Sequence, residues 1–298
     1  MKIGTRGSRL ARWQADWVRD RLAEHGVTAE IVVIKTRGDA EVDRPLHELE
    51  GKGFFTKEIE DALLDRRIDV AVHSLKDLPT ALPPGLALGA IPARHDSREA
   101  LVSGASIAEL AAGTRVGTSS LRRIAQVRFL RPDLQVVPLR GNVPTRVKKV
   151  ETRDGLDAAL LAIAGLARLG LETKASIVDP LEVMPAPGQG ALGIEIREDD
   201  NATRKAIAPL HDRVSAAAVL AERGLLAALG GGCQAPVGAW VGMRETGNGR
   251  RLYGRVTERD GSVQLTASAD LDESKPEQAG EAVARLLEGE GAASLLAR

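Results

Sequence analysis

Short apolar strands alternate with helix-like periods from the start of the chain to about residue 196, and this alternation constrains the fold most strongly. The run Ile31 to Ile34 has the character of a buried strand, and Leu10 to Glu24 has apolar residues at helical spacing. Thr56 to Arg67 predicts a second helix, followed by a strand over Ile68 to Val72. Strands that alternate with helices are typical of a mostly parallel α/β sheet. The residues of the two helices expected to face the core are Leu10, Trp13, Trp17, Val18, Ile59, Leu63 and Leu64.

The same pattern repeats in a second segment that begins near Asp96. A strand is expected at 114–117, a helix at 120–130 and another strand at 136–139. After a Pro/Gly-rich crossing, residues 191–196 look like a strand that could return to the first sheet. The remainder predicts a small α+β domain, with helices at 215–229 and 276–287 and an alternating strand at 263–271. We therefore predict domain 1 at 1–94 and 191–211, domain 2 at 95–190, which interrupts it, and domain 3 at 212–298.

Charge and composition exclude several classes of function. The 41 basic and 41 acidic residues give no net charge, which argues against a general nucleic-acid surface. No apolar run reaches the roughly 18 residues of a membrane span, and the N-terminus lacks the apolar core of a signal peptide. One cysteine excludes an intramolecular disulfide and leaves no CxxC pair for a zinc site. We expect a cytoplasmic protein.

Arginine occurs with glycine or a hydroxyl residue after three of the predicted strands, at 6–9, 117–123 and 139–146. Ligands of open α/β sheets bind beyond the carboxyl ends of strands, where helix N-termini present free N–H groups. Arginines at a helix N-terminus oppose the helix dipole unless an anion is present, and guanidinium groups match carboxylates bidentately. The pattern favours a carboxylate or phosphate site. For 117–123, the alternative is an ordinary Ser/Thr cap with solvated arginines.

Two further segments carry reactive side chains. Cys233 lies in the glycine loop 230–236, where it is either a small buried side chain or an accessible, modified thiol. Asp77 follows the strand that ends near Val72 and has Lys76 beside it. It could be a held carboxylate that protonates a leaving group, or one half of an exposed ion pair. We expect His73 to be a hydrogen-bonded scaffold residue.

The segment 51–57 is a basic loop bracketed by glycines and containing two adjacent phenylalanines. It lacks the spacing of a phosphate-binding P-loop, so nucleotide hydrolysis is not expected. A flap over a site and a simple connection both remain open.

Taken together, these segments resemble the porphobilinogen deaminase family, in the family's order and along nearly the whole chain. The motifs that carry the resemblance are Gly4-Thr5-Arg6-Gly7-Ser8, Thr36-Arg37-Gly38-Asp39, Gly51-Lys52-Gly53, His73-Ser74-Leu75-Lys76-Asp77, Gly117-Thr118-Ser119-Ser120-Leu121-Arg122-Arg123, Leu139-Arg140-Gly141-Asn142-Val143, Gly188-Gln189-Gly190 and Gly231-Gly232-Cys233. Two positions depart from the family pattern: Pro144 stands where Gly is expected, and Phe54 where Leu is common.

The resemblance implies a fold and an activity. The expected fold has two α/β domains like those of type II periplasmic solute-binding proteins, plus a small α+β C-terminal domain. The expected enzyme is a transferase that deaminates and polymerises four porphobilinogen molecules head to tail and then releases hydroxymethylbilane by hydrolysis. It works on a dipyrromethane primer that a thioether holds to Cys233. Asp77 matches the catalytic aspartate, which shares a proton with the departing amine and stabilises the positive azafulvene-like intermediate.

The resemblance also assigns the other site residues. Those expected to bind the cofactor are Cys233, Ser74, Lys76, Asp77, Thr118, Ser119, Ser120, Arg122, Arg123, Arg146 and Gly190. Those expected to bind incoming porphobilinogen are Arg6, Ser8, Arg140, Arg146, Arg168 and Gln189, and the flap residues are Lys52, Phe54 and Lys57. The resemblance implies no metal, no nucleic-acid or membrane partner, and a monomer.

Two other classes of protein share parts of this pattern. A solute-binding protein would have the same two α/β domains and anion sites, but it should carry an export signal and needs no Cys233 loop. A module that only senses a tetrapyrrole would keep the arginines and have no use for Asp77. Ammonia release from porphobilinogen distinguishes the enzyme from both.

Overall fold

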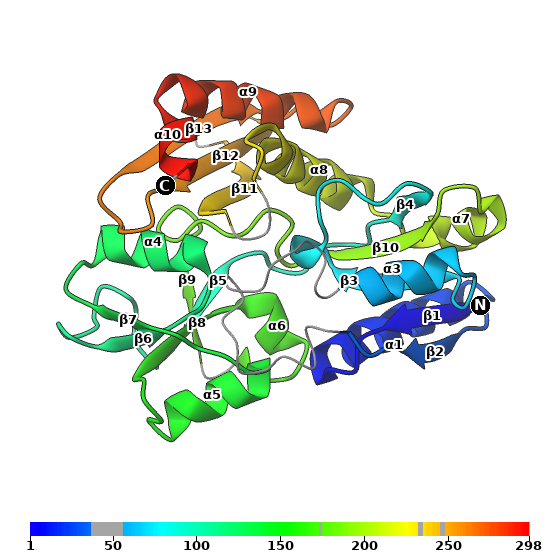
Figure 1. Cartoon of the computed structure of the whole chain (residues 1–298), viewed down its shortest axis with the longest axis horizontal. Helices are drawn as coiled ribbons and strands as arrows, with labels where there is room; N and C mark the ends of the chain where they lie inside the picture. The colour runs from blue at the N-terminus through cyan, green and yellow to red at the C-terminus, as the bar shows by residue number, and fades with distance from the viewer. Residues whose placement is uncertain (37–55, 173–174, 232–234, 245–247, 298) are drawn as a thin grey trace. The chain divides into compact units, whose positions relative to one another are not determined.

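The computed structural model describes residues 1–36, 56–172, 175–231, 235–244 and 248–297 (Figure 1). The chain forms two compact units, one of residues 1–95 with 190–216 and one of residues 96–189 with 217–298. The first unit holds one five-stranded sheet, and the second holds a five-stranded and a three-stranded sheet. The mixed α/β class with a separate C-terminal sheet is confirmed. The boundary between predicted domains 2 and 3 stays a prediction, because both lie in the second unit.

The sheet of the first unit has the order β2-β1-β3-β10-β4. Its strands are β1 (Lys2–Thr5), β2 (Glu30–Val33), β3 (Val70–Ser74), β4 (Leu86–Ala90) and β10 (Leu192–Arg197). β1 runs parallel to β2 and β3, whereas β10 runs antiparallel to β3 and β4. The predicted return of segment 191–196 to the first sheet is therefore confirmed. Helix α7 (Asn201–Ile207) follows β10.

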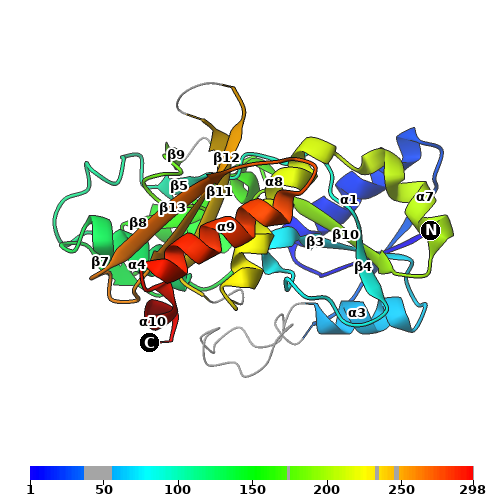
Figure 2. The same cartoon turned by 90° about the horizontal axis from the view of Figure 1, so that it is seen from above.

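Helices α1 (Arg9–Glu24) and α3 (Lys57–Leu64) pack on opposite faces of this sheet (Figure 2). The predicted core stripe of α1 is only partly right. Val18 is fully buried and Trp17 packs against the same core, as predicted, with the guanidinium of Arg21 5.9 Å from its ring centroid. The other buried core positions, Ala15 and Leu22, were not predicted. The expected burial of Leu64 is wrong, because its side chain is 44% exposed at the end of α3.

The first sheet of the second unit repeats this plan in the order β7-β6-β8-β5-β9. Its strands are β5 (Glu99–Val102), β6 (Arg115–Gly117), β7 (Gln135–Val137), β8 (Ala158–Ala162) and β9 (Ala175–Val178), with helices α4 (Leu121–Leu130), α5 (Val143–Glu151) and α6 (Ile163–Ala167). β6 runs parallel to both neighbours, and β5 runs antiparallel to both of its own. Four of the five strands in each large sheet therefore run in one direction, and a single reversed strand, β10 or β5, makes the sheet mixed.

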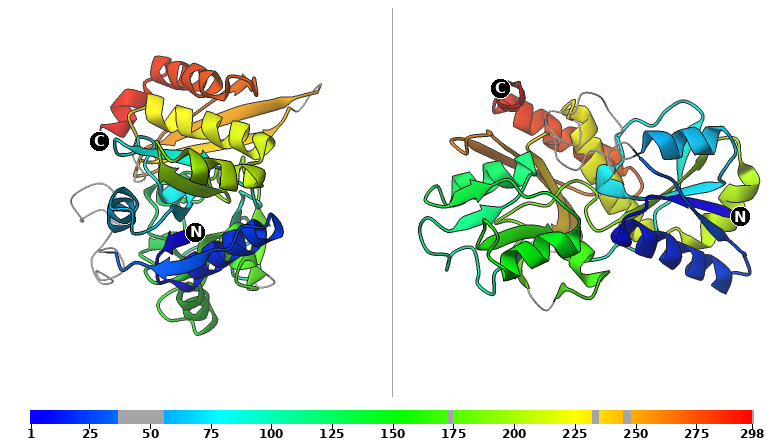
Figure 3. Two further views of the ribbon diagram at one scale, coloured as in Figure 1. Left: turned by 90° about the vertical axis from the view of Figure 1, so that its right-hand side faces the viewer. Right: turned by 60° about the horizontal axis from the view of Figure 1, so that its bottom comes forward.

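The C-terminal sheet is antiparallel and consists of β11 (Val237–Met243), β12 (Arg250–Thr257) and β13 (Gln264–Asp270). One face packs on helices α8 (Arg213–Ala228), α9 (Pro276–Gly289) and α10 (Ala292–Leu296) through a separate apolar core (Figure 3). On the other face, a Cβ built on Gly238 would lie 2.8 Å from the Met184 Cβ, so the close approach here requires glycine. None of the described helices combines the length and the apolar character needed to cross a membrane.

An ion pair joins β6 to the start of β8. The Asp157 carboxylate accepts hydrogen bonds from Arg115 Nη2 at 3.0 Å, Nε at 3.1 Å and the backbone N–H at 3.0 Å. The Arg115 side chain, and then its backbone N–H, lower the pKa of Asp157 to about 2. In the unfolded chain the pKa of an aspartate is about 3.9.

We expect Asp157→Asn to weaken the dependence of the free energy of unfolding on pH in the acid range. A carboxyl whose pKa is depressed on folding contributes stability that is complete above its unfolded pKa and is lost as pH falls through its folded pKa. The variant should therefore be less stable above pH ~5, and the difference should shrink between pH ~4 and ~2. Urea unfolding across this pH range measures it, with the exposed Asp154→Asn as control. Curves that stay parallel down to pH ~2 would contradict the assignment.

Candidate functional site

The loop between β6 and α4 presents the N-terminus of a helix beside a second loop. Ser119 Oγ donates to the carbonyl oxygen of Leu139 at 2.9 Å and accepts from the Leu139 N–H at 3.0 Å, which joins segment 117–120 to segment 139–141. Thr118 is buried, and its Oγ1 accepts from the Ser120 N–H at 3.3 Å. Ser120 precedes α4 with extended backbone and makes no side-chain capping bond. An ordinary serine cap therefore does not account for this helix start.

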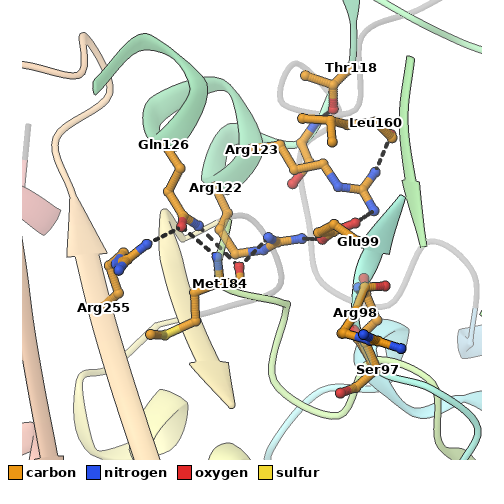
Figure 4. Close-up of polar contacts among 12 residues, drawn as sticks. Ser97, Arg98, Glu99, Thr118, Arg122, Arg123, Gln126, Leu160, Met184 and Arg255 are labelled. Carbon is orange, nitrogen blue, oxygen red and sulfur yellow. Dashed lines mark hydrogen bonds and ion pairs between the residues drawn. The ribbon is translucent and has the colours of Figure 1, made fainter. Parts of the chain in front are cut away.

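The first turn of α4 carries Arg122 and Arg123, both almost fully buried. Arg122 Nη2 and Arg123 Nη2 donate to the two oxygens of Glu99 at 2.6 and 2.7 Å, and Glu99 is completely buried (Figure 4). Arg122 Nη1 also donates to the Met184 carbonyl oxygen at 2.5 Å, and Arg123 Nη1 to that of Leu160 at 2.9 Å. The alternative of solvated arginines is therefore wrong.

Positive charge exceeds negative charge around Glu99, because its carboxylate is shared by two guanidinium groups. Burial lowers the pKa of Arg122; Glu99 opposes that shift and Arg123 adds to it. Arg123 Nε is buried without a hydrogen-bond partner among the described residues. A buried charge is costly unless it is paired. This arrangement therefore fits a ligand that brings carboxylates to the first turn of α4.

The segment after β7 supplies the next two candidate arginines. Asn142 caps α5 by accepting a hydrogen bond from the Thr145 N–H at 3.0 Å, and Pro144 lies in the first turn, where proline is well tolerated. Arg146 Nε donates to the Gly141 carbonyl oxygen at 2.7 Å. Arg140 precedes Gly141 directly, so the Ser119–Leu139 hydrogen bonds bring Arg140 and its neighbours beside the start of α4.

Arg168 lies at the C-terminal end of α6 and is 6% exposed. Burial lowers its pKa to about 10. A guanidinium that gives up hydration to this extent is suited to binding an anion in a dry site.

Gln189 and Gly190 belong to the chain that crosses between the two units. Gln189 is completely buried, and its Nε2 donates to the Ser97 carbonyl oxygen at 2.8 Å. The Gly188 N–H donates to Glu222 Oε2 at 2.8 Å. Gly188 and Gly190 have φ of 75° and 84°, which glycine adopts without strain. The described contact of the Gln189 amide is thus structural, and its role with substrate stays a prediction.

The first unit holds the remaining predicted residues at the carboxyl ends of β1 and β3. These strands are adjacent and parallel, so residues that follow them meet at one edge of the sheet. After β1 come Arg6 and Ser8, whose Oγ caps α1 by accepting from the Ala11 N–H at 3.2 Å. At the end of β3, Ser74 Oγ accepts from Gln14 Nε2 at 2.8 Å.

Asp77 ends a short 3₁₀ turn, Leu75–Asp77, that follows β3. Leu75 is fully buried and anchors the turn, Lys76 is half-buried and Asp77 is exposed. His73 is a scaffold residue as expected: its Nε2 lies 3.0 Å from Glu195 Oε2, and both side chains are buried. Asp77 therefore lies at the exposed end of a turn that the buried Leu75 anchors.

Several predicted residues lie outside the described part of the chain: Cys233, Lys52 and Phe54. Lys57 is described, as the exposed first residue of α3. Within the described residues, no group of three or more His, Cys, Asp or Glu side chains is arranged to hold a metal ion. Sequence reasoning missed Glu99 and Met184, whose oxygens accept hydrogen bonds from the two arginines. It also missed Gln126, which binds the Met184 peptide, and Arg255, which donates to Gln126. The one signal in the sequence was that Arg122 and Arg123 are adjacent, because two arginines at the start of a helix need an acidic partner when they are buried.

Two family models match the chain. Residues 1–205 match "Porphobilinogen deaminase, dipyromethane cofactor binding domain", and residues 216–289 match "Porphobilinogen deaminase, C-terminal domain". The chain is 47% identical to the porphobilinogen deaminase of Syntrophotalea carbinolica, over 100% of this chain and 95% of that one. It is 48% identical to that of Moorella thermoacetica, over 99% and 95% of the two chains. It is 50% identical to that of Paracoccus denitrificans, over 90% and 87%.

Among solved structures, an ABC-transporter periplasmic substrate-binding protein from Coxiella burnetii is similar at a TM-score of 0.43 and 13% identity. The match covers 72% of this chain and 94% of that one.

Proposed function

The chain belongs to the porphobilinogen deaminase family, and from that membership we propose which of its residues carry out the family's reaction. The protein is a transferase of tetrapyrrole and haem biosynthesis that uses a dipyrromethane cofactor. It deaminates and polymerises porphobilinogen, head to tail and four molecules per product, and releases hydroxymethylbilane by hydrolysis. We propose Cys233 as the thioether anchor of the cofactor and Asp77 as the catalytic residue.

The excess of buried positive charge at the first turn of α4 is the observation that carries this proposal. Arg122 and Arg123 share one protein carboxylate, that of Glu99. Every pyrrole unit of the cofactor has an acetate and a propionate arm, so the cofactor supplies further carboxylates that can balance their charge. The described residues proposed to hold it are Ser74, Lys76, Asp77, Thr118, Ser119, Ser120, Arg122, Arg123, Arg146 and Gly190. When bound, the cofactor supplies the pyrrole end to which each new unit is joined.

Asp77 is placed to handle the leaving amine. Its carboxyl group gives a proton to the amino group of porphobilinogen as the carbon–nitrogen bond breaks, and ammonia departs. The carboxylate that remains stabilises the positive charge left on the pyrrole unit. The exposed position of Asp77 on an anchored turn supports this role, because an incoming substrate can reach it.

Incoming porphobilinogen meets a second group of side chains. We propose that its two carboxylates bind among Arg6, Ser8, Arg140, Arg146, Arg168 and Gln189, and that Lys52, Phe54 and Lys57 belong to a flap. The depressed pKa of Arg168, about 10 through burial, supports an anion as its ligand.

We also propose a cytoplasmic monomer that uses porphobilinogen as its small-molecule partner and needs neither nucleic acid nor a membrane. The equal numbers of basic and acidic residues, 41 each, support the absence of a nucleic-acid partner. Light scattering on the purified protein measures the oligomeric state.

Intact mass of the denatured protein tests the anchor directly. We expect an excess mass of two porphobilinogen units less two ammonia molecules in the native sequence, and none in Cys233→Ser. Added porphobilinogen should extend the native protein in steps of one unit less ammonia. An unmodified native protein that gains no mass from porphobilinogen would contradict the proposal and favour a module that only binds.

A further inference from the structure

We propose that Arg255, on the C-terminal sheet, is a positioning residue for the anion site at the start of helix α4. It acts through the Gln126 amide and the Met184 peptide, which together set where the Arg122 guanidinium lies. The inference rests on the proposed function and deepens it, because it makes cofactor binding in one part of the second unit depend on a side chain of another.

Arg255 lies on the face of β12 that points away from the helices α8 and α9. Its Nη1 donates to Gln126 Oε1 at 3.0 Å and to the Glu182 carbonyl oxygen at 3.1 Å, and its Nη2 to the Leu181 carbonyl oxygen at 2.8 Å. Thr266 Oγ1 accepts from Nε at 3.2 Å. These acceptors are all neutral, and burial lowers the pKa of Arg255 to about 10. The Arg255 guanidinium is therefore held by carbonyl and hydroxyl oxygens rather than by a carboxylate.

Gln126 connects Arg255 to the backbone of Met184, the first residue of the Pro/Gly-rich segment 184–190, called the crossover segment below. It is 1% exposed, its Oε1 accepts from the Met184 N–H at 2.7 Å, and its Nε2 donates to the Met184 carbonyl oxygen at 3.1 Å. The two donors on Oε1, Met184 N–H and Arg255 Nη1, fix which end of the amide is oxygen. Both polar groups of Met184 are thereby held by one side chain of α4.

Arg122 shares the Met184 carbonyl oxygen with Gln126 and continues the chain of contacts to Glu99 and Arg123 (Figure 4). Each link is a direct hydrogen bond between buried groups, so a shift at one link is felt at the next. The C-terminal sheet also approaches Met184 closely at Gly238. Contacts from the C-terminal sheet therefore fix the position of the crossover segment relative to the start of α4.

A double-mutant cycle with Arg255→Met and Gln126→Leu tests the inference on the primer-loaded enzyme. We expect each single variant to lower kcat about tenfold per folded molecule, with KM for porphobilinogen within about twofold, as for other outer residues that orient a site. The double variant should be no slower than Gln126→Leu, because Arg255 acts through Gln126. Arg255→Lys keeps the charge but loses the fork, and it should resemble Arg255→Met.

The control is Arg128→Ala, which removes an exposed arginine whose Nη1 donates to the Arg259 carbonyl oxygen at 3.0 Å across the same contact. Amide exchange in a Cys233→Ser background gives a readout independent of the primer. Arg255→Met should accelerate exchange at 122–126 about tenfold, and Arg128→Ala should leave it unchanged.

Three results would overturn the inference: additive losses of kcat, a change confined to KM, or a lower unfolding midpoint with kcat and amide exchange unchanged. Failure of the proposed function is recognised separately, as a native protein without primer mass. The amide-exchange comparison then still decides whether Arg255 positions α4.

Discussion

Replacement of Asp77 by asparagine should lower kcat by about 10²–10⁴-fold and leave the fold unchanged. Asparagine has the same shape but neither delivers a proton to the leaving amine nor offsets the positive charge that forms. The fold should persist because Asp77 is exposed at the end of its 3₁₀ turn, while the buried Leu75 anchors that turn. Ammonia release and intact mass after one addition of porphobilinogen measure the effect.

The exposed Asp61 of α3, in the same unit, offers a matched control. Asp61→Asn should turn over normally, and both variants should unfold at the temperature of the native sequence. Turnover by Asp77→Asn within about tenfold of normal would remove Asp77 from the catalytic role.

Replacement of Glu99 by glutamine should destabilise the protein by about 3–5 kcal/mol, because it leaves two buried guanidinium groups without their carboxylate. For a chain of this size, that corresponds to a fall in Tm of roughly 6–20 °C. The fall in Tm caused by Glu99→Gln should be larger in a Cys233→Ser background than in the cofactor-loaded protein. Carboxylates of the bound cofactor would offset part of the positive charge that the substitution leaves on Arg122 and Arg123.

Both effects are measured by thermal unfolding of four proteins: the native sequence, Glu99→Gln, Cys233→Ser and the double variant. Asp133→Asn is the control, because the Arg131–Asp133 pair at 2.6 Å has the same chemistry at the surface and should contribute little. An equal loss of Tm with and without the primer would mean that the bound cofactor does not compensate Arg122 and Arg123.

Local patterns predicted much of the fold. The helices α1, α4, α8 and α9 and the strands β3, β6 and β10 lie within a few residues of their predicted ranges, because apolar periodicity and turn residues specify them locally. Strand direction was not predictable in this way. β5 and β10 run antiparallel to their neighbours, and the alternation of strands with helices carries no information on that point.

The candidate site shows the same division. The arginines and hydroxyls of 117–123 were visible as a motif, since they are contiguous in the chain. Their partners were not visible, because Glu99 is 23 positions from Arg122 and Arg255 is 129 positions from Gln126. Ion pairs between distant segments follow from tertiary packing, and no local propensity reports them.

The place of β10 between β3 and β4 has a consequence for synthesis on the ribosome. β3 is complete at Ser74, but its antiparallel neighbour begins only at Leu192, after the whole first sheet of the second unit has been made. At about 5–20 residues per second, the edge of β3 waits roughly 6–24 s for its partner. During that interval the nascent chain presents an open apolar strand, Val70–Val72, to chaperones and to neighbouring chains. The sheet whose strands β1, β2 and β3 are translated early is therefore completed only after the first sheet of the second unit has been synthesised.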